Sequence, residues 1–194
     1  MEWLIPIRAV GSNYPARLTL IKLMISYYNF IHFKNQTKMA KELAIIVDVD
    51  GTLADMKGIR GPFEWDKVHL DKPHQDVIEL VQDFARMGQP IYAEFDGSLV
   101  DMPHKYKIII TTGRDGVCEE ATRKWLDHYK VPYDEFFIRK AGDNRKDNII
   151  KSEIYMDHIR PKYDVKYVID DRNQVVDMWR SLGLRVLQVA PGNF

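Results

Sequence analysis

The sequence predicts an α/β fold in which helices cover both faces of a parallel sheet. Short apolar runs of strand length recur along the chain, and segments with helical periodicity lie between them. Such alternation is typical of a three-layer, Rossmann-like arrangement. Acidic residues follow directly after several of the apolar runs, which predicts a ligand site at the carboxyl ends of the strands.

Five strands and four helices are expected after residue 39. The strands are predicted at residues 43–47, 108–110, 136–138, 167–169 and 186–189. The helices are predicted at residues 77–87, 117–129, 147–158 and 175–182, from apolar residues spaced three or four apart. In the third helix, Ile150, Ile154 and His158 recur every fourth residue. Residues 91–102 do not fit this scheme, and two short β-prone runs around Asp96-Gly97 predict an inserted hairpin there.

The composition indicates a soluble chain with one domain, or one domain and a short appendage. The 194 residues are 45% apolar, which is enough to bury a core. Basic and acidic residues are equal at 28 each, so an anionic ligand must be held by a local cluster. Cys118, the only cysteine, excludes an intrachain disulfide and indicates a reducing cytoplasm. The apolar stretch at residues 18–33 is interrupted by polar residues and is too short to span a membrane.

The net charge and the residue pattern of the chain change near Met39. Residues 1–38 carry five Lys or Arg and one Glu, a net charge of +4, and show no capped amphipathic pattern. Two interpretations stay open: translation begins at Met39, or residues 1–38 form a helical appendage that packs on the domain or on a partner. The α/β domain is expected over residues 39–194.

Four carboxylates are predicted to meet at one edge of the sheet. Asp48 and Asp50 follow the first strand, and Asp170 and Asp171 follow the fourth. Because neighbouring carboxylates repel one another, a divalent cation is expected among them. Oxygen ligands without Cys or His suit a hard ion, so Mg²⁺ is the predicted cofactor.

The same edge carries groups that phosphoryl transfer needs. Asp48, at the end of a rigid strand, can attack phosphorus and form an aspartyl-phosphate. Asp50 can protonate the leaving oxygen and then activate water. Gly51 allows a tight turn whose amides would face the phosphoryl oxygens.

Donors further along the chain complete the predicted site. Thr112 and Arg114 follow the second strand and can donate hydrogen bonds to phosphoryl oxygens. Lys151 supplies a point charge, and Asp147, one helical turn earlier, can orient it. Alone, each motif has an ordinary structural explanation, such as a surface ion pair for Asp147 and Lys151. Their occurrence together and in this order favours a functional site.

These motifs resemble those of the haloacid dehalogenase superfamily of phosphohydrolases. The matching elements are Asp48-x-Asp50-Gly51-Thr52, Thr112, Lys151 and Asp170-Asp171. Over about residues 43–194 the chain is similar, more narrowly, to the 3′-phosphatase domain of phage-type polynucleotide kinase/phosphatase. The residues that carry this similarity are Gly58-Ile-Arg60-Gly61-Pro62-Phe63, Thr122-Arg-Lys-Trp125, Gly142-Asp-Asn-Arg-Lys-Asp147, residues 163–166 and Ile169-Asp-Asp-Arg-Asn-Gln-Val-Val-Asp-Met-Trp-Arg180.

The resemblance implies a role for each matching residue. The implied catalytic residues are Asp48 as nucleophile, Asp50 as acid and base, Thr112 and Lys151; the substrate-binding residues are Thr52, Arg60, Arg114 and Asp147; and the Mg²⁺ ligands are Asp48, the Asp50 carbonyl, Asp170 and Asp171. The resemblance also implies the sheet order 5-4-1-2-3. A small flap at residues 55–63 and no large cap domain are expected, which leaves the site open to a polynucleotide end.

The function implied by the resemblance is Mg²⁺-dependent removal of 3′-phosphate from DNA or RNA ends in nucleic-acid repair. No Gly-x-x-x-x-Gly-Lys-Ser/Thr loop occurs in the sequence, so a kinase half is not expected. Four basic residues lie near the predicted site: Arg139, Lys140, Arg145 and Lys146. Two interpretations stay open: they bind along a nucleic-acid backbone, or they belong to an ordinary solvated loop.

Other functions stay open. One is a deoxynucleotide or other small-molecule phosphatase of the same superfamily, which the neutral overall charge slightly favours. Another is a non-catalytic module that binds phosphate or nucleic-acid ends. A signalling receiver domain is excluded because its acidic pair comes first along the chain, whereas here the Asp48-x-Asp50 motif comes first and the pair comes last. No membrane partner is expected, and a homo-oligomer is left open.

Overall fold

The computed structural model describes residues 41–87, 91–92, 99–100 and 106–192. The main sheet consists of the parallel strands β1 (Glu42–Val47), β6 (Lys107–Asp115), β7 (Glu135–Arg139), β8 (Tyr163–Arg172) and β9 (Val186–Gly192). The helices are α2 (Gln75–Arg86), α3 (Glu119–His128), α4 (Asp147–Ile154) and α5 (Asn173–Ser181). This alternation of strands and helices confirms the predicted α/β fold.

The strands lie in the order β7-β6-β1-β8-β9, with β1 in the middle. Ile45 of β1 lies opposite Ile108 of β6, and Val47 lies opposite Ile169 of β8. Numbered by their place along the chain, the strands read 5-4-1-2-3 from the β9 edge. The carboxyl end of β1 therefore lies between the carboxyl ends of β6 and β8.

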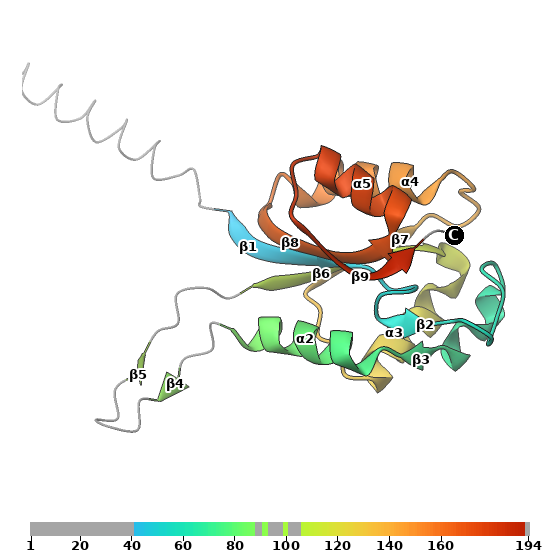
Figure 1. Cartoon of the computed structure of the whole chain (residues 1–194), viewed down its shortest axis with the longest axis horizontal. Helices are drawn as coiled ribbons and strands as arrows, with labels where there is room; N and C mark the ends of the chain where they lie inside the picture. The colour runs from blue at the N-terminus through green and yellow to red at the C-terminus, as the bar shows by residue number, and fades with distance from the viewer. Residues whose placement is uncertain (1–40, 88–90, 93–98, 101–105, 193–194) are drawn as a thin grey trace, which may run out of the picture. The chain divides into compact units, whose positions relative to one another are not determined.

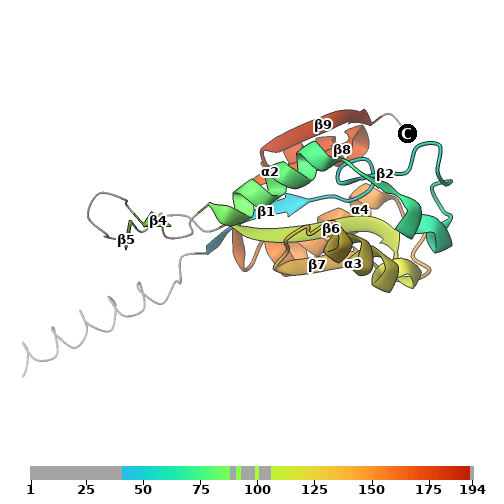
Figure 2. The ribbon, with the colours of Figure 1, turned by 90° about the horizontal axis from the view of Figure 1, so that it is seen from below.

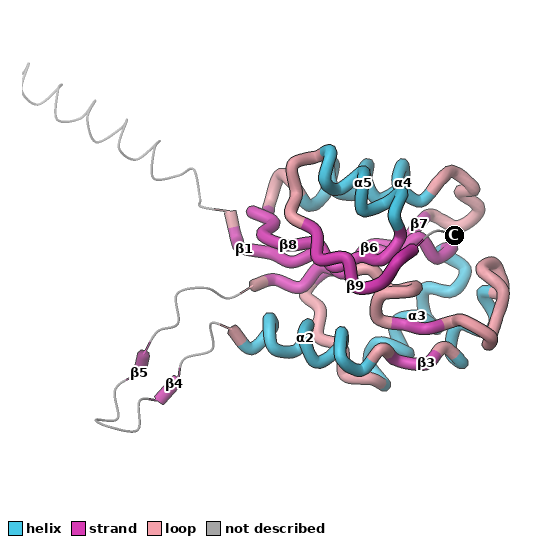
Figure 3. Tube along the Cα trace, in the orientation of Figure 1, coloured by secondary structure: helices cyan, strands magenta, loops and turns pink. Residues whose placement is uncertain are grey.

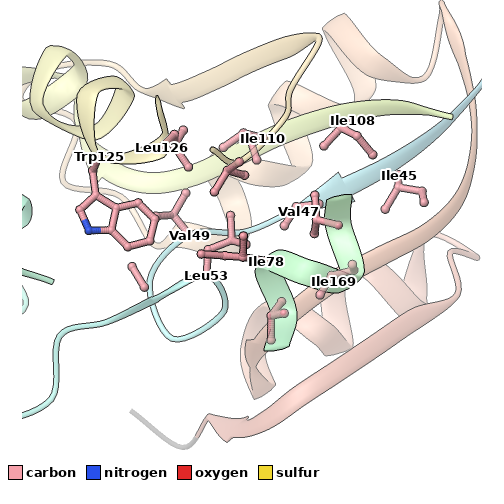
Figure 4. Packing of buried hydrophobic residues seen from close by; sticks show 14 residues of the cluster. Ile45, Val47, Val49, Leu53, Ile78, Ile108, Ile110, Trp125, Leu126 and Ile169 are labelled. Atoms are coloured by element: carbon pink, nitrogen blue, oxygen red, sulfur yellow. The ribbon is translucent and has the colours of Figure 1, made fainter. Parts of the chain in front are cut away.

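Both faces of the sheet are buried, because successive side chains of a strand point to opposite faces. On one face Ile45 packs with Ile78 of α2 and Leu126 of α3, in the cluster that Figure 4 shows. On the other face Ile46 packs with Trp179 of α5. Figures 1 and 2 show α4 and α5 on one side of the sheet and α2 and α3 on the other. Burial on both faces explains why the strands read as apolar runs.

Two predicted helices differ from the structure. The helix predicted at residues 147–158 ends as a π-helical turn, η3 (Tyr155–Ile159), in which the Arg160 N–H donates to the Tyr155 carbonyl at 2.7 Å. Because a π turn contains an extra residue, the buried face shifts by one position. Tyr155 and Ile159 are therefore buried, whereas His158 is exposed. The helix predicted at residues 117–129 begins later, after a 3₁₀ turn η2 (Gly116–Cys118) in which Val117 is exposed.

A small flap follows β1, and we use this name for residues 55–72. It is bordered by β2 (Ala54–Asp55) and β3 (Lys72–Pro73), which pair antiparallel, and it contains the 3₁₀ helix η1 (Trp65–Leu70). Figure 1 shows the flap beyond the carboxyl end of β1, and the tube in Figure 3 shows its loop character. Between β6 and α4 the chain forms η2, α3 and β7.

One predicted segment lies partly, and another wholly, outside the described residues. The strands β4 (Ile91–Tyr92) and β5 (Leu99–Val100) pair antiparallel, while Asp96-Gly97 of the predicted hairpin is not described. Residues 1–38, the predicted extension, are not described either. Within the described part of the chain, none of the helices combines the length and the apolar character that a membrane crossing requires.

Candidate active site

The predicted site residues gather at the carboxyl ends of the three central strands. Asp48 follows β1, Thr112 lies in β6, Asp170 and Asp171 lie in β8, and Lys151 lies in α4. All of them are buried. The sheet thus brings together residues that are far apart in sequence, as the positions of the strands predicted.

Asp48 is held by two donors. Lys151 Nζ lies 2.6 Å from Asp48 Oδ1, and the Thr52 hydroxyl donates to Oδ2 at 3.3 Å. Lys151 Nζ also lies 3.0 Å from Asp170 Oδ2. Burial raises the pKa of Asp48 well above its usual value, although the charge of Lys151 opposes this rise. Burial would lower the pKa of Lys151, but Asp147, Asp170 and Asp48 together raise it well above its usual value, so the lysine is a fixed positive charge.

Asp48, Asp170 and Asp171 form a group suited to a metal ion. Their carboxylate oxygens lie within 4.8 Å of one another. Three carboxylates face one ammonium group, that of Lys151, so the ionised cluster carries two negative charges in excess. Burial, and then the neighbouring charge of Asp170, raise the pKa of Asp171 to about 6. A divalent cation would balance the excess, so these residues fit a hard divalent ion.

Two glycines allow this close packing of carboxylates. Gly51 has a φ of +83°, and a Cβ atom at this position would overlap with the carboxylate of Asp171. A Cβ atom on Gly113 would overlap with the carboxylate of Asp147. Asp147 Oδ2 lies 3.6 Å from Lys151 Nζ, so the two are neighbours on α4 as their spacing predicted.

Asp50 belongs to a second cluster, with two arginines. Its Oδ1 accepts hydrogen bonds from Arg60 Nη2 at 2.8 Å and from Arg114 Nη2 at 2.6 Å. Behind the arginines, the buried carboxylate of Asp71 accepts from Arg60 Nε at 2.7 Å and from Arg114 Nη2 at 2.6 Å. Two carboxylates therefore balance two guanidinium groups. Within the described chain, the hydrogen bonds to the Asp50 carboxylate all end on Oδ1, which fixes its orientation.

The two arginines point to carboxylates in this structure. Both are buried, and burial of a guanidinium group requires a nearby anion, which Asp71 provides. Asp71 and Asp50 also raise the pKa of Arg60, against the opposing effect of burial. The predicted contact of Arg60 and Arg114 with a phosphate group stays a prediction.

The turn after β1 also differs from the expectation. The Gly51 N–H donates to the Ala54 carbonyl at 2.8 Å, and the Thr52 N–H donates to the Val49 carbonyl at 3.2 Å. These two amides close the turn instead of facing a phosphoryl group, because the chain makes a tight loop between Asp50 and Ala54, which form a parallel bridge. The Thr112 hydroxyl accepts from the Arg114 N–H at 3.2 Å, and its own hydrogen is still a donor.

Two residues of the site were not predicted from the sequence. Asp71 follows η1 outside any motif, and no signal pointed to it. Trp179 was predicted as an apolar position of a helix and as part of the string that carries the family resemblance, without a role at the site, yet its Nε1 donates to Asp170 Oδ2 at 3.2 Å. The indole N–H of a buried tryptophan usually finds a partner, which was the one available signal.

A cleft of about 390 Å³ opens onto Asp48 and Asp50. The flap contributes Phe63 and Trp65 to its wall, and the loop before α4 contributes Lys146. The cleft therefore combines the acidic centre with an aromatic and a basic border.

The four predicted backbone-binding cations differ in their surroundings. Arg139 donates to the Gly113 carbonyl at 2.8 Å, and Arg145 pairs with Asp143 and Glu153, both at 2.7 Å. Arg139 also donates to the Asp143 and Arg145 carbonyls at 2.9 and 2.6 Å, so the two arginines organise the loop before α4. Lys140 and Lys146 are exposed.

Comparisons with known proteins identify the family. Residues 42–194 match the family described as the polynucleotide kinase PNKP phosphatase domain. A protein of the Autographa californica nuclear polyhedrosis virus, described as a bifunctional polynucleotide kinase/RNA ligase, is 32% identical over 141 residues. The aligned part is 72% of this chain and 18% of the viral protein.

Two solved structures are similar in both sequence and fold. A chain in the structure of the Pnkp1/Rnl/Hen1 complex has a TM-score of 0.67 and 36% identity, over 80% of this chain and 48% of that chain. A chain of the Pnkp1/Rnl/Hen1 RNA repair complex has a TM-score of 0.66 and 36% identity, over 80% of this chain and 45% of that chain. The chain thus spans less than half the length of these relatives. The matches confirm the resemblance indicated by the motifs: the chain belongs to the polynucleotide kinase PNKP phosphatase-domain family of haloacid dehalogenase type, and it is a phosphatase.

Proposed function

We propose that this phosphatase removes the 3′-phosphate from polynucleotide ends through an aspartyl-phosphate on Asp48. The observation that carries the proposal is the position of Asp48, which lines an open cleft while Lys151 and Thr52 fix its two oxygens. A carboxylate held in this way loses little freedom on attack, which favours its use as a nucleophile.

In the first step, an oxygen of Asp48 attacks the phosphorus atom of the 3′-phosphate. The bond between phosphorus and the 3′-oxygen breaks, and this oxygen takes a proton from Asp50. The arginine cluster orients Asp50 for this step, because Arg60 and Arg114 bind it through Oδ1 and leave Oδ2 as the oxygen that can exchange a proton.

In the second step, a water molecule attacks the phosphorus atom of the aspartyl-phosphate and gives a proton to Asp50. The bond between phosphorus and Asp48 breaks, which restores both carboxyl groups and releases inorganic phosphate. Asp48, Asp170, Asp171 and the Asp50 carbonyl would hold Mg²⁺, which would supply positive charge to the phosphoryl oxygens. Lys151, a fixed cation beside Asp48, would add to this charge.

The proposed substrate class rests on the relatives and on the open cleft. One relative is described as a polynucleotide kinase/RNA ligase, and another belongs to an RNA repair complex. The same two steps would serve a small-molecule phosphatase, so the substrate is what an experiment must decide.

The experiment measures phosphate release with Mg²⁺ or EDTA. The substrates are 3′-phosphorylated DNA and RNA oligonucleotides, a 5′-phosphorylated oligonucleotide and a 3′-mononucleotide. We expect kcat/KM for a 3′-phosphorylated oligonucleotide to exceed that for the mononucleotide roughly tenfold or more, and EDTA to abolish release. Asp48→Asn is expected to lower kcat about 10⁴-fold. After an acid quench, Asp50→Asn is expected to retain labelled phosphate on the protein, because its second step lacks a base.

Each result has a separate meaning. Preference for the mononucleotide would keep the chemistry and overturn the polynucleotide substrate. Release that is unaffected by Asp48→Asn would overturn the nucleophile. The ratio between DNA and RNA substrates decides which polymer the enzyme repairs.

A further inference from the structure

An exposed aromatic side chain lies at the border of the active-site cleft. Phe63 is 81% exposed, the highest exposure among the large hydrophobic residues that the structure describes as exposed. It lines the cleft together with Asp48 and Asp50. The proposed chemistry gives it no role, because phenylalanine carries neither a charge nor a hydrogen-bonding group.

The Phe63 ring is connected to the catalytic acid by a short series of contacts. It meets Trp65 edge-on, with ring centroids 6.0 Å apart. The Arg60 guanidinium lies 5.8 Å from the centroid of Trp65, and Arg60 binds Asp50. The aromatic pair is therefore attached to a buried ionic cluster at the cleft that Asp50 lines, while most of Phe63 is exposed to solvent.

The size and chemistry of the cleft fit one nucleotide. Its volume of about 390 Å³ is at the lower end of small-ligand sites. With the phosphate at Asp48, the attached sugar and base extend toward the border of the cleft. A basic residue, Lys146, is exposed on the loop before α4, and the aromatic pair lies on the flap. An aromatic ring accepts any base by stacking, whereas an anionic backbone favours the basic border.

We propose that Phe63 stacks on the nucleobase of the 3′-terminal nucleotide and so favours 3′-phosphates that carry a base over phosphate esters that lack one. This inference rests on the proposed function, since it assigns a substrate contact to that site. Stacking on an aromatic ring requires no particular base, so the enzyme would act on all four terminal nucleotides.

The test combines a change in the protein with a change in the substrate. The first substrate is a 3′-phosphorylated oligonucleotide, the second is the same oligonucleotide with an abasic 3′-terminal residue, and the third is p-nitrophenyl phosphate. Phe63→Ala is expected to lower kcat/KM roughly tenfold on the first substrate, mainly through KM. On the abasic substrate and on p-nitrophenyl phosphate the change is expected to stay within about twofold. Phe63→Tyr, which keeps the ring, is expected to retain the wild-type kcat/KM on the first substrate.

Leu70→Ala is the matched control, because Leu70 is exposed on the same flap but does not line the cleft. It is expected to leave all three rates unchanged. If Phe63→Ala lowers kcat/KM equally on the intact and abasic substrates, or on neither, the stacking contact is overturned. The proposed function stands in that case, provided that the wild type releases 3′-phosphate from the oligonucleotide. If the wild type acts on p-nitrophenyl phosphate but on neither oligonucleotide, the proposed function fails and the stacking contact fails with it.

Discussion

The two carboxylates of the Asp48-x-Asp50 motif belong to ionic clusters with different charge balances. The nucleophile cluster consists of Asp48, Asp170, Asp171 and Lys151, with three acids and one base. The arginine cluster consists of Asp50, Asp71, Arg60 and Arg114, with two acids and two bases. One cluster carries excess negative charge, and the other is neutral.

This difference indicates how each carboxylate is prepared for its role. The arginine cluster needs no added ion, so the protein alone orients Asp50. The nucleophile cluster has excess negative charge without a cation. Burial is the main cause of the raised pKa values of Asp48 and Asp171, and the neighbouring carboxylates add to it. We infer that metal binding prepares the nucleophile, whereas the acid is prepared by folding.

Replacement of the cation in each cluster is the strongest way to test this comparison. Lys151→Met leaves three carboxylates without a positive charge, and Arg114→Met leaves Asp50 and Asp71 with Arg60. Both are expected to lower kcat about 10³-fold or more and to lower the free energy of unfolding by about 3–5 kcal/mol. The difference lies in the response to Mg²⁺, which would bind at Asp48, Asp170 and Asp171 and could there take the place of the lysine charge, whereas it would not replace the charge of Arg114.

Thermal unfolding with Mg²⁺ and with EDTA checks this response. We expect Mg²⁺ to raise the Tm of Lys151→Met by more than it raises the Tm of the wild type, and to raise the Tm of Arg114→Met by no more than that of the wild type. The same Mg²⁺ response in both variants would show that the two clusters are not separate.

Asp71→Asn is a smaller change to the neutral cluster. It leaves two buried guanidinium groups with one carboxylate, Asp50, which is expected to cost about 3 kcal/mol of stability. Because Asp50 would then be less firmly oriented, kcat is expected to fall about 10²-fold. Measurements of kcat, of KM and of denaturant unfolding check this, and KM for p-nitrophenyl phosphate is expected to change little.

Asp134→Asn is a matched control for Asp71→Asn. Asp134 pairs with Lys107 at 2.8 Å and accepts from the Ile108 N–H at 2.9 Å at the amino end of β6, and an asparagine keeps one oxygen that can accept this bond. Its replacement is expected to cost below about 1 kcal/mol and to leave kcat unchanged. If the kcat of Asp71→Asn equals that of the wild type, the position of Asp50 does not depend on the arginines.

The two clusters also differ in how well the sequence predicted them. Asp48 and Asp170 each follow an apolar run of a strand, and parallel strands present their carboxyl ends on the same side of a sheet, so their meeting could be predicted. Asp71 follows a 3₁₀ helix in the flap. Its position beside Arg60 and Arg114 depends on how the flap folds back, which no periodicity describes. The sequence predicted Arg60 and Arg114 as phosphate contacts, which stays a prediction, but it did not predict that both pair with Asp71.

The same limit applies to the helix after β7. The spacing of Ile150, Ile154 and His158 fits an α-helix, but the chain changes to a π turn at Tyr155. Tertiary packing of Tyr155 and Ile159 against the sheet decides this, and a regular period cannot show it. The strands and the acids were predictable because each depends on local pattern, whereas Asp71 and the π turn depend on contacts between distant segments.

Gly113→Ala should have the smallest effect, and it acts on the nucleophile cluster indirectly. The added Cβ would overlap with the carboxylate of Asp147, which lies 3.6 Å from Lys151 Nζ. Because Asp147 must move, Lys151 is less well held beside Asp48, and kcat is expected to fall about tenfold, with a loss of about 1–3 kcal/mol in stability. At Gly61 an added Cβ would lie 3.5 Å from Glu64 Oε2, an ordinary contact, so Gly61→Ala is the control and is expected to leave both quantities nearly unchanged. The result also separates two views of Asp147: if Gly113→Ala lowers stability but leaves kcat intact, Asp147 only packs against the sheet edge and does not position the lysine.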